Sequence, residues 1–336
     1  MRHRFLGLMG PTVTLVAVMS LMSNSVAGQA PPAAQTPADA GTYVASRTPD
    51  GQPDISGMWL PGQVGGVETP SGEPWRGQRT GNATEFLFGI TARPETRAAA
   101  GEAPAPPRIM VVDPPDGKIP LQPWAAAKRT EIIANQDKVE YLDGRVLCLP
   151  SGIPRQNSPI LYNSYQFLQK PGYVVMLYEY DHNYRIIPLD GRPHLNPNVR
   201  LGLGVLHGHW EGNTLVVDVT NFSTDLPNNN WVTGLGQPPW GAPASALTSG
   251  HGVIHSDVLH VIERFTRVDA DTIRYEATIE DPKVFTRPWK IAYDAFKRAP
   301  PDHQLFEYAC HEGEKSIVLM TGVDRDKVYQ EMLSLK

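Results

Sequence analysis

Hydrophobic and polar residues alternate through most of the chain after residue 165, which is the pattern of β-strands with one buried face. Turn sequences rich in glycine, proline or aspartate separate the alternating segments. The predicted strands lie within residues 166–169, 173–189, 204–210, 214–222, 258–268, 272–281, 289–296 and 304–310. No helix-length crossover lies between these strands, so the sequence predicts an antiparallel meander.

Residues 41–164 show less regular alternation, and we expect them to form an irregular region that packs on a strand-rich domain, residues 165–336. ISGMW at 55–59 looks like a first short strand. An alanine-rich stretch at 124–142 has two adjacent isoleucines on one side and charges on the other, which predicts the one helix of the fold.

A meander of about eight strands either stays an open sheet or closes into a barrel, which removes its exposed edges. A closed barrel of that size has room inside for side chains or for one small ligand. We therefore predict a mainly β fold, an antiparallel meander that closes into a lipocalin-like barrel.

The first 27 residues have a basic start, an apolar run and a small-residue exit at Ala27, which is the pattern of an export signal. A membrane anchor is the alternative, because the run is close to the length needed to span a bilayer. Residues 28–40 have the composition of a disordered linker. We expect a periplasmic or secreted protein, cleaved near Ala27 and not anchored afterwards.

The chain has two cysteines, Cys148 and Cys310. In an oxidising compartment a lone pair most simply forms a disulfide. The alternative is two free thiols that serve as ligands or nucleophiles.

The formal charge of −5 gives no basic surface for nucleic acid, so we expect a small-molecule substrate or ligand and no nucleic-acid partner. The sequence contains no GxSxG, P-loop, GxGxxG, HExxH or EF-hand pattern, which removes the strong signals for several enzyme classes.

The motifs TPDGQPDISGMW, DPPDGKIP, HWEGNTLVVDVTNF, HSDVLHVIERFT and FEYACHEG together resemble a large, functionally uncharacterised family of exported bacterial proteins. The resemblance runs from about Thr48 through most of the chain and implies a secreted, largely β protein. The histidine-rich LHGHW before EGNTLVV departs from the family pattern. A looser similarity to lipocalin-like barrels rests on the meander alone.

The segment 251–265, HGVIHSDVLHVIERF, carries three histidines, an aspartate, a glutamate and an arginine. Alternation places His260 and Arg264 on one face of its strand, and Glu263 on the other, more hydrophobic face. Charges among core positions must be paired or lie in a wet cavity. One interpretation is therefore an ion pair, such as Arg264 with an acid on a neighbouring strand.

The other interpretation is catalytic. A histidine oriented by a carboxylate can act as an acid or a base near neutral pH, and an arginine can stabilise an anion. The candidate catalytic residues are His255, His260, Asp257, Glu263 and Arg264.

A second cluster, YEYDHNYR, is expected to lie on one strand. Alternation then separates Tyr178, Tyr180, His182 and Tyr184 on one face from Glu179, Asp181 and Arg185 on the other. Such a tyrosine-rich face either lines a ligand pocket or is an outer surface. The candidate substrate-binding residues are Tyr178, Tyr180, His182, Arg185, Trp231 and Trp240.

His207 and His209 are two residues apart, so both imidazoles point the same way from a strand, as a metal site requires. With His251 or His255 they form the alternative metal site, for a divalent ion such as zinc. The favoured expectation is that no cofactor is needed.

The connection at 223–252 is long and rich in glycine, proline, asparagine and tryptophan. Loops of this length in compact domains are usually lids or binding loops. It leads directly into the histidine-rich segment, with Trp231 and Trp240 as its apolar contacts. A disordered excursion is the alternative interpretation.

These features favour an exported, cofactor-free acid/base enzyme, a lyase, isomerase or hydrolase that acts on a small, partly hydrophobic molecule in the barrel cavity. One alternative is a non-catalytic periplasmic carrier of a hydrophobic ligand, which needs the same barrel but no acid/base group. The other is a metal-dependent enzyme that uses the histidine cluster.

Overall fold

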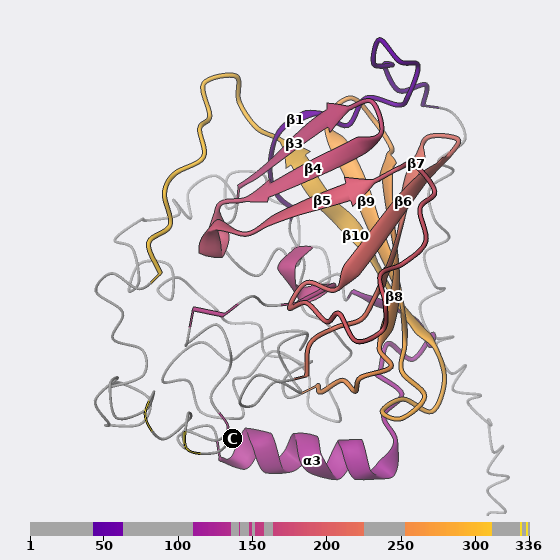
Figure 1. Ribbon diagram of the computed structural model, residues 1–336, viewed down its shortest axis with the longest axis vertical. Helices are drawn as coiled ribbons and strands as arrows, with labels where there is room; N and C mark the ends of the chain where they lie inside the picture. Colours follow the sequence, from indigo (N-terminus) through magenta and orange to yellow (C-terminus); the bar gives the residue numbers. More distant parts are fainter. Residues whose placement is uncertain are drawn as a thin grey trace, which may run out of the picture. The chain divides into compact units, whose positions relative to one another are not determined.

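The described part of the chain folds mainly into one antiparallel sheet of ten strands (Figure 1). This computed structural model describes residues 43–62, 110–135, 141, 148–149, 152–157, 164–224, 253–310, 330 and 334. The predicted export signal and linker, and all but the first residues of the predicted lid loop, lie outside them.

Nine strands follow one another through the sheet in the order β5–β4–β3–β1–β10–β9–β8–β7–β6, and β2 pairs with β10 beside this path. The strands are β1 (Gly57–Pro61), β2 (Val111–Asp113), β3 (Tyr165–Lys170), β4 (Tyr173–Tyr178), β5 (Tyr184–Pro188), β6 (Val205–Glu211), β7 (Thr214–Thr220), β8 (His260–Arg267), β9 (Thr272–Glu280) and β10 (Trp289–Arg298). The structure also describes the α-helix α3 (Pro123–Ala134) and the 3-10 helices η3 (Arg155–Asn157) and η4 (Tyr180–His182).

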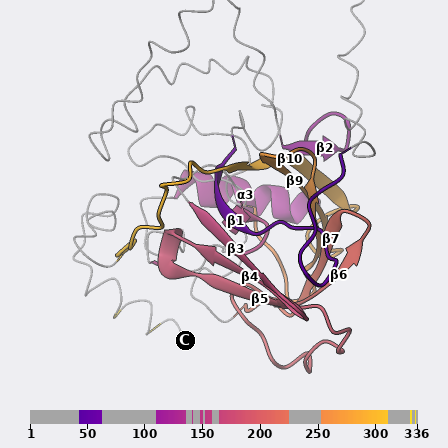
Figure 2. The ribbon, with the colours of Figure 1, turned by 90° about the horizontal axis from the view of Figure 1, so that it is seen from above.

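The prediction of a mainly β, antiparallel fold is confirmed, and the sheet is nearly closed into a barrel. Seen from above, it curves round until β6 approaches β5 (Figure 2). Gly208 on β6 makes this approach possible, because an added Cβ would lie 2.6 Å from Ile187 Cγ2 and 2.9 Å from Leu189 Cδ2. Side-chain packing therefore seals the seam, where no strand ladder joins β5 to β6.

Three predicted elements differ from the structure. The run 173–189 is two strands, because η4 interrupts it. Residues 304–310 form no strand. The helix ends at Ala134, where Asn135 leaves the helical conformation, and is shorter than the predicted 124–142.

The region before residue 165 contributes directly to the sheet. β1 lies between β3 and β10, and pairs with both. Trp59 on β1 is fully buried and lies under the Arg298 guanidinium of β10, with 4.4 Å between the guanidinium carbon and the ring centroid. The barrel therefore draws on both parts of the chain that the sequence pattern separates.

Alternation within the strands sorts side chains between a packed interior and an outer surface. On β8, Val261, Glu263 and Phe265 are fully buried, whereas His260 and Arg264 face outwards and are partly exposed. The two faces predicted for this strand are confirmed. Aromatic rings fill the interior, where Phe265, Phe167 and Phe296 pack against one another and against tyrosines of the neighbouring strands.

Candidate functional site

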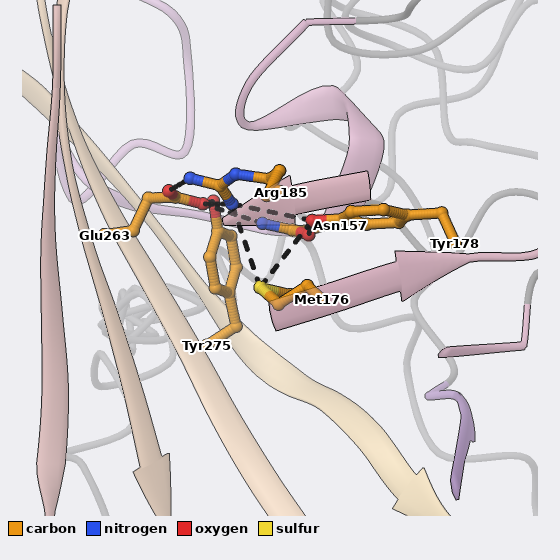
Figure 3. Close-up of polar contacts among 6 residues, drawn as sticks. All are labelled: Asn157, Met176, Tyr178, Arg185, Glu263 and Tyr275. Atoms are coloured by element: carbon orange, nitrogen blue, oxygen red, sulfur yellow. Dashed lines mark hydrogen bonds and ion pairs between the residues drawn. The ribbon is translucent and has the colours of Figure 1, made fainter. Parts of the chain in front are cut away.

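A buried ion pair stands at the centre of the barrel interior (Figure 3). Arg185 on β5 binds Glu263 on β8 through both terminal nitrogens, and both side chains are fully buried. Asn157 and Tyr275 also donate hydrogen bonds to Glu263 Oε1, over 2.7 and 2.9 Å. The hydroxyl of Tyr178 donates to Asn157 Oδ1 over 2.9 Å, which connects β4 to the same network.

This network explains why a glutamate occupies a core position. A buried carboxylate is costly unless it is paired and hydrogen-bonded. Glu263 accepts four hydrogen bonds from three residues, so its lone pairs are largely occupied. Glu263 and Arg185 therefore hold the barrel together and are poorly placed to exchange a proton or bind a substrate anion.

The same contacts correct the predicted faces of YEYDHNYR. Tyr178 and Arg185 were expected on opposite faces of one strand, but both point into the barrel. The 3-10 turn η4 breaks the alternation, so that β4 and β5 form a hairpin with Met176 opposite Arg185. Burial accordingly raises the pKa of Tyr178 to about 12.

A second cluster of titratable side chains lies on the outer face of β6, β7 and β8. His260 Nε2 is 3.0 Å from Asp218 Oδ1, and His194 Nε2 is 3.4 Å from the same oxygen. His194 Nδ1 is 3.1 Å from His207 Nδ1. Glu280 completes the cluster, 3.4 Å from His260 Nδ1.

Strand register builds this cluster from residues far apart in the sequence. His207 on β6 lies directly opposite Asp218 on β7, and His260 on β8 lies opposite Glu280 on β9. Asp218 pairs with Ile262, so His260 is its diagonal neighbour on the same face, within reach of a side-chain contact. His194 comes from the loop between β5 and β6.

The surroundings in this cluster shift the pKa values of His207 and His260 in opposite directions. The hydrogen bond to Asp218, and to a lesser degree Glu280, raises the pKa of His260 above its usual 6.5. Burial lowers the pKa of His207, and the neighbouring His194 lowers it further. The hydrogen bond from His260 holds the pKa of Asp218 below its usual range. Two like groups with pKa values pushed apart are the arrangement in which one can serve as acid and the other as base.

The structure does not bring His209 and Arg264 into this cluster. His209 Nε2 lies 3.0 Å from Glu211 Oε1, and Arg264 Nη2 lies 2.8 Å from Glu211 Oε2. His207 and His209 share a face, as expected, but have different partners. Arg264 thus forms an ion pair on the outer surface, but its partner Glu211 lies on β6, two strands away, and not on a neighbouring strand as the ion-pair interpretation expected.

His255 and Asp257 have different partners. His255 is buried, with its Nδ1 2.9 Å from the Ser256 carbonyl oxygen. Asp257 is on the surface, where it binds Lys283 over 2.6 Å and lies 3.6 Å from Arg200. In these contacts His255 is not oriented by Asp257, although the catalytic interpretation expected it.

The remaining predicted binding residues are scattered. Tyr180 is buried and packs against Tyr308, with ring centroids 4.7 Å apart. His182 is exposed at the end of η4, with a positive φ. The other three lie outside the described residues: Trp231, Trp240 and His251.

Within the described ranges, no group of three or more metal-ligating residues is arranged to hold an ion. Nor is any helix in those ranges long and apolar enough to cross a membrane. Cys148 and Cys310 are joined in a disulfide with a Cα–Cα distance of 5.7 Å, as predicted. The disulfide points to an oxidising, exported environment.

His194, Asp218 and Glu280 are the residues of this cluster that sequence analysis missed. Asp218 lies in TLVVDVTNF, where its only signal was a charge that interrupts an apolar strand. His194 lies in the loop after β5, and no periodicity links it to His207. The register between β6 and β7 places Asp218 opposite His207, and the path of the β5–β6 loop brings His194 to both.

A scan against protein-family models, a search of curated proteins and a search of solved structures each found no match to this chain.

Proposed function

We propose that this protein is an exported acid/base enzyme, a lyase, isomerase or hydrolase that acts on a small, partly hydrophobic organic molecule. His207 is its base, His260 is its acid, and Asp218 lies between them. The observation that carries this proposal is the contact of one carboxylate, Asp218, with His260 at 3.0 Å and with His194 at 3.4 Å, while His194 in turn lies 3.1 Å from His207. The opposite directions of the pKa shifts of His207 and His260 agree with it. The resemblance to a family of exported bacterial proteins is consistent with the proposed location.

His207 has the properties of a general base. Its lowered pKa favours the neutral imidazole near neutral pH. Its Nδ1 faces His194 Nδ1, and among the described residues no hydrogen-bond partner faces its Nε2. A consistent proton arrangement has His207 Nδ1–H donating to His194, which leaves the lone pair of His207 Nε2 to take a proton from a substrate.

His194 then positions the base. With its Nδ1 accepting from His207, its proton lies on Nε2 and is directed at Asp218, 3.4 Å away. Thr220 Oγ1, 3.2 Å from His194 Nδ1, further restricts the ring. This order of carboxylate, histidine and histidine fixes the tautomer of the base, as the orienting carboxylate does for a catalytic histidine.

His260 has the properties of a general acid. Carboxylates face both of its ring nitrogens, Asp218 at 3.0 Å and Glu280 at 3.4 Å, so that the imidazolium form is favoured. The contact with Glu280 is the longer of the two. A substrate oxygen or nitrogen therefore competes for the Nδ1 proton of His260, whereas the hydrogen bond to Asp218 holds the ring in place.

The apolar part of a substrate has contacts available beside this cluster. The loop from β5 to β6 exposes Leu195, Val199 and Leu201, each with at least 42% of its surface accessible. Asn221 at the end of β7 anchors this loop through hydrogen bonds to the carbonyl oxygens of Leu195 and Asn196. The proposed site is thus on the outer face of the sheet, because the described interior positions are filled with buried side chains.

The test uses 5-nitrobenzisoxazole, whose ring opens when a base removes its carbon-bound proton and which therefore needs no nucleophile. We expect ring opening by the purified protein to fall by about a hundredfold in His207→Gln. His209→Gln is the matched control, because it changes a histidine on the same strand and face that has other partners. Equal rates in the wild type and His207→Gln would overturn the proposal.

The same assay separates the enzyme from a ligand carrier. A carrier does not accelerate ring opening above the rate in buffer, with or without His207. The enzyme accelerates it with a pH dependence that rises through the lowered pKa of His207, because only the neutral imidazole accepts a proton.

A further inference from the structure

The segment that follows β10 contacts the chain just before β3 and just after β4. Two contacts fix its position. Ser164 Oγ lies 2.7 Å from His303 Nε2, and Tyr308 packs on Tyr180. The Cys148–Cys310 disulfide covalently ties down the segment just beyond Tyr308.

Ser164 is rigidly held. Its backbone N–H donates to Glu179 Oε2 over 3.2 Å, and its carbonyl oxygen accepts from the Glu179 N–H over 3.0 Å. Its side chain is buried, with 6% of the residue accessible, while its hydroxyl faces a partly exposed imidazole. Holding a hydroxyl in one direction removes the entropic cost of orienting it for reaction.

His303 is fixed as well. Its backbone N–H donates to the Pro300 carbonyl oxygen over 3.0 Å, which closes a turn directly after β10. The two side chains thus meet at the distance at which a base can take a proton from a hydroxyl. Serine is a weak nucleophile unless such a base is present, and the pair of a serine and a bound histidine is the arrangement that activates it.

We propose that Ser164 and His303 form a second reactive site, a serine nucleophile with its general base, and that this site acts on carboxylic esters. The pair is separate from the histidine cluster on β6–β8 in every residue. Its reactivity does not depend on the function proposed for that cluster.

The reaction is an acyl transfer with water as the second substrate. The Ser164 oxygen forms a bond to the ester carbonyl carbon, and its proton passes to His303 Nε2. The bond from that carbon to the alcohol oxygen then breaks, and the alcohol leaves with the proton from His303. Water adds to the acyl-serine with loss of a proton to His303, and the carboxylic acid departs as Ser164 regains its proton.

The neighbouring aromatic pair indicates the class of ester. Tyr180 follows Glu179, which holds Ser164, and Tyr308 lies on the same segment as His303. The two rings are tilted at 42° to each other, with their centroids 4.7 Å apart. Tyr180 is buried, whereas the Tyr308 ring is partly exposed. Aromatic and aliphatic groups pack well on such a ring, so the favoured esters carry an apolar acyl or alcohol group.

The experiment is labelling with a fluorescent alkyl fluorophosphonate, in which a serine oxygen displaces fluoride from phosphorus. We expect the full disulfide-bonded protein to be labelled, with the label mapped to Ser164 by peptide mass spectrometry. Ser164→Ala abolishes labelling, and His303→Gln slows it by about a hundredfold, since glutamine keeps a hydrogen bond to Ser164 but cannot act as a base.

Ser56→Ala is the matched control. The hydroxyl of Ser56 is partly buried and also hydrogen-bonded, but its partner is a carboxylate, Asp54, at 2.6 Å. This variant should be labelled at the wild-type rate. No label on the folded wild type, label on a different serine, or an unchanged rate in His303→Gln would each overturn the proposal and leave the pair as a structural clasp.

Discussion

Arg185 and Glu263, 78 residues apart in the chain, form a fully buried ion pair between strands β5 and β8, which do not pair with each other in the sheet. The pair therefore joins two non-adjacent strands through the barrel interior. Glu263 interrupts an otherwise hydrophobic face, and Arg185 supplies the charge that makes this burial tolerable.

Removing one member of the pair should be more damaging than removing both. Glu263→Gln leaves the Arg185 charge buried without a counter-charge, and we expect it to lower the free energy of unfolding by about 3–5 kcal/mol. In Arg185→Met/Glu263→Gln neither charge of the pair remains, and the glutamine oxygen can still accept from Asn157 and Tyr275. Urea denaturation of the wild type, the single variant and the double variant measures their free energies of unfolding. A double variant less stable than Glu263→Gln would contradict the structural role of the pair.

The seam of the barrel should be sensitive to a single methyl group. Gly208→Ala places a Cβ 2.6 Å from Ile187 Cγ2, a methyl that cannot rotate away easily because isoleucine is branched at Cβ. Overpacking of this kind costs about 1–3 kcal/mol of unfolding free energy. Ile187→Ala removes the obstructing methyl, so Gly208→Ala should cost less in its presence. If the two substitutions changed the free energy of unfolding additively, residues 208 and 187 would not be in contact, and β6 would not pack on β5 at this point.

The barrel was predictable because its strands carry local signals. Alternation on 258–268 and 272–281 separates the two faces, and the short turn at 269–271 fixes them as neighbours. The division of 173–189 was not predictable from period alone. Residues 180–182 continue the alternation of polar and aromatic residues but form η4, so the chain reverses where the pattern suggested one strand.

The candidate site was only partly predictable, for a related reason. The sequence identified His207 and His260 as unusual but grouped His260 with Glu263, three residues away. On a strand such residues point to opposite faces, and Glu263 is inside while His260 is outside. The true partners, Asp218 and His194, depend on register between strands and on the path of a loop, which single-sequence patterns do not specify.

The two histidines of the proposed site should change stability with pH in opposite ways. The folded-state pKa of His260 is raised above 6.5, so its contribution to stability is fully present below pH 6.5 and is lost as pH rises through the folded value. The difference in unfolding free energy between the wild type and His260→Gln should therefore shrink as pH rises. Denaturation between about pH 5 and about pH 8 measures it, the range in which histidines titrate.

The contribution of His207 to stability changes with pH in the opposite direction. Its folded-state pKa is lowered, so its contribution is present above its usual value of 6.5 and is lost as pH falls through the folded value. The difference between the wild type and His207→Gln should therefore grow as pH rises over the same range. Asp218 does not confuse the comparison, because its own lowered pKa places its titration below 3.8. The stability differences of the two variants from the wild type could instead change in the same direction with pH. The two histidines would then not divide into an acid and a base, and the proposed chemistry would lose its physical basis.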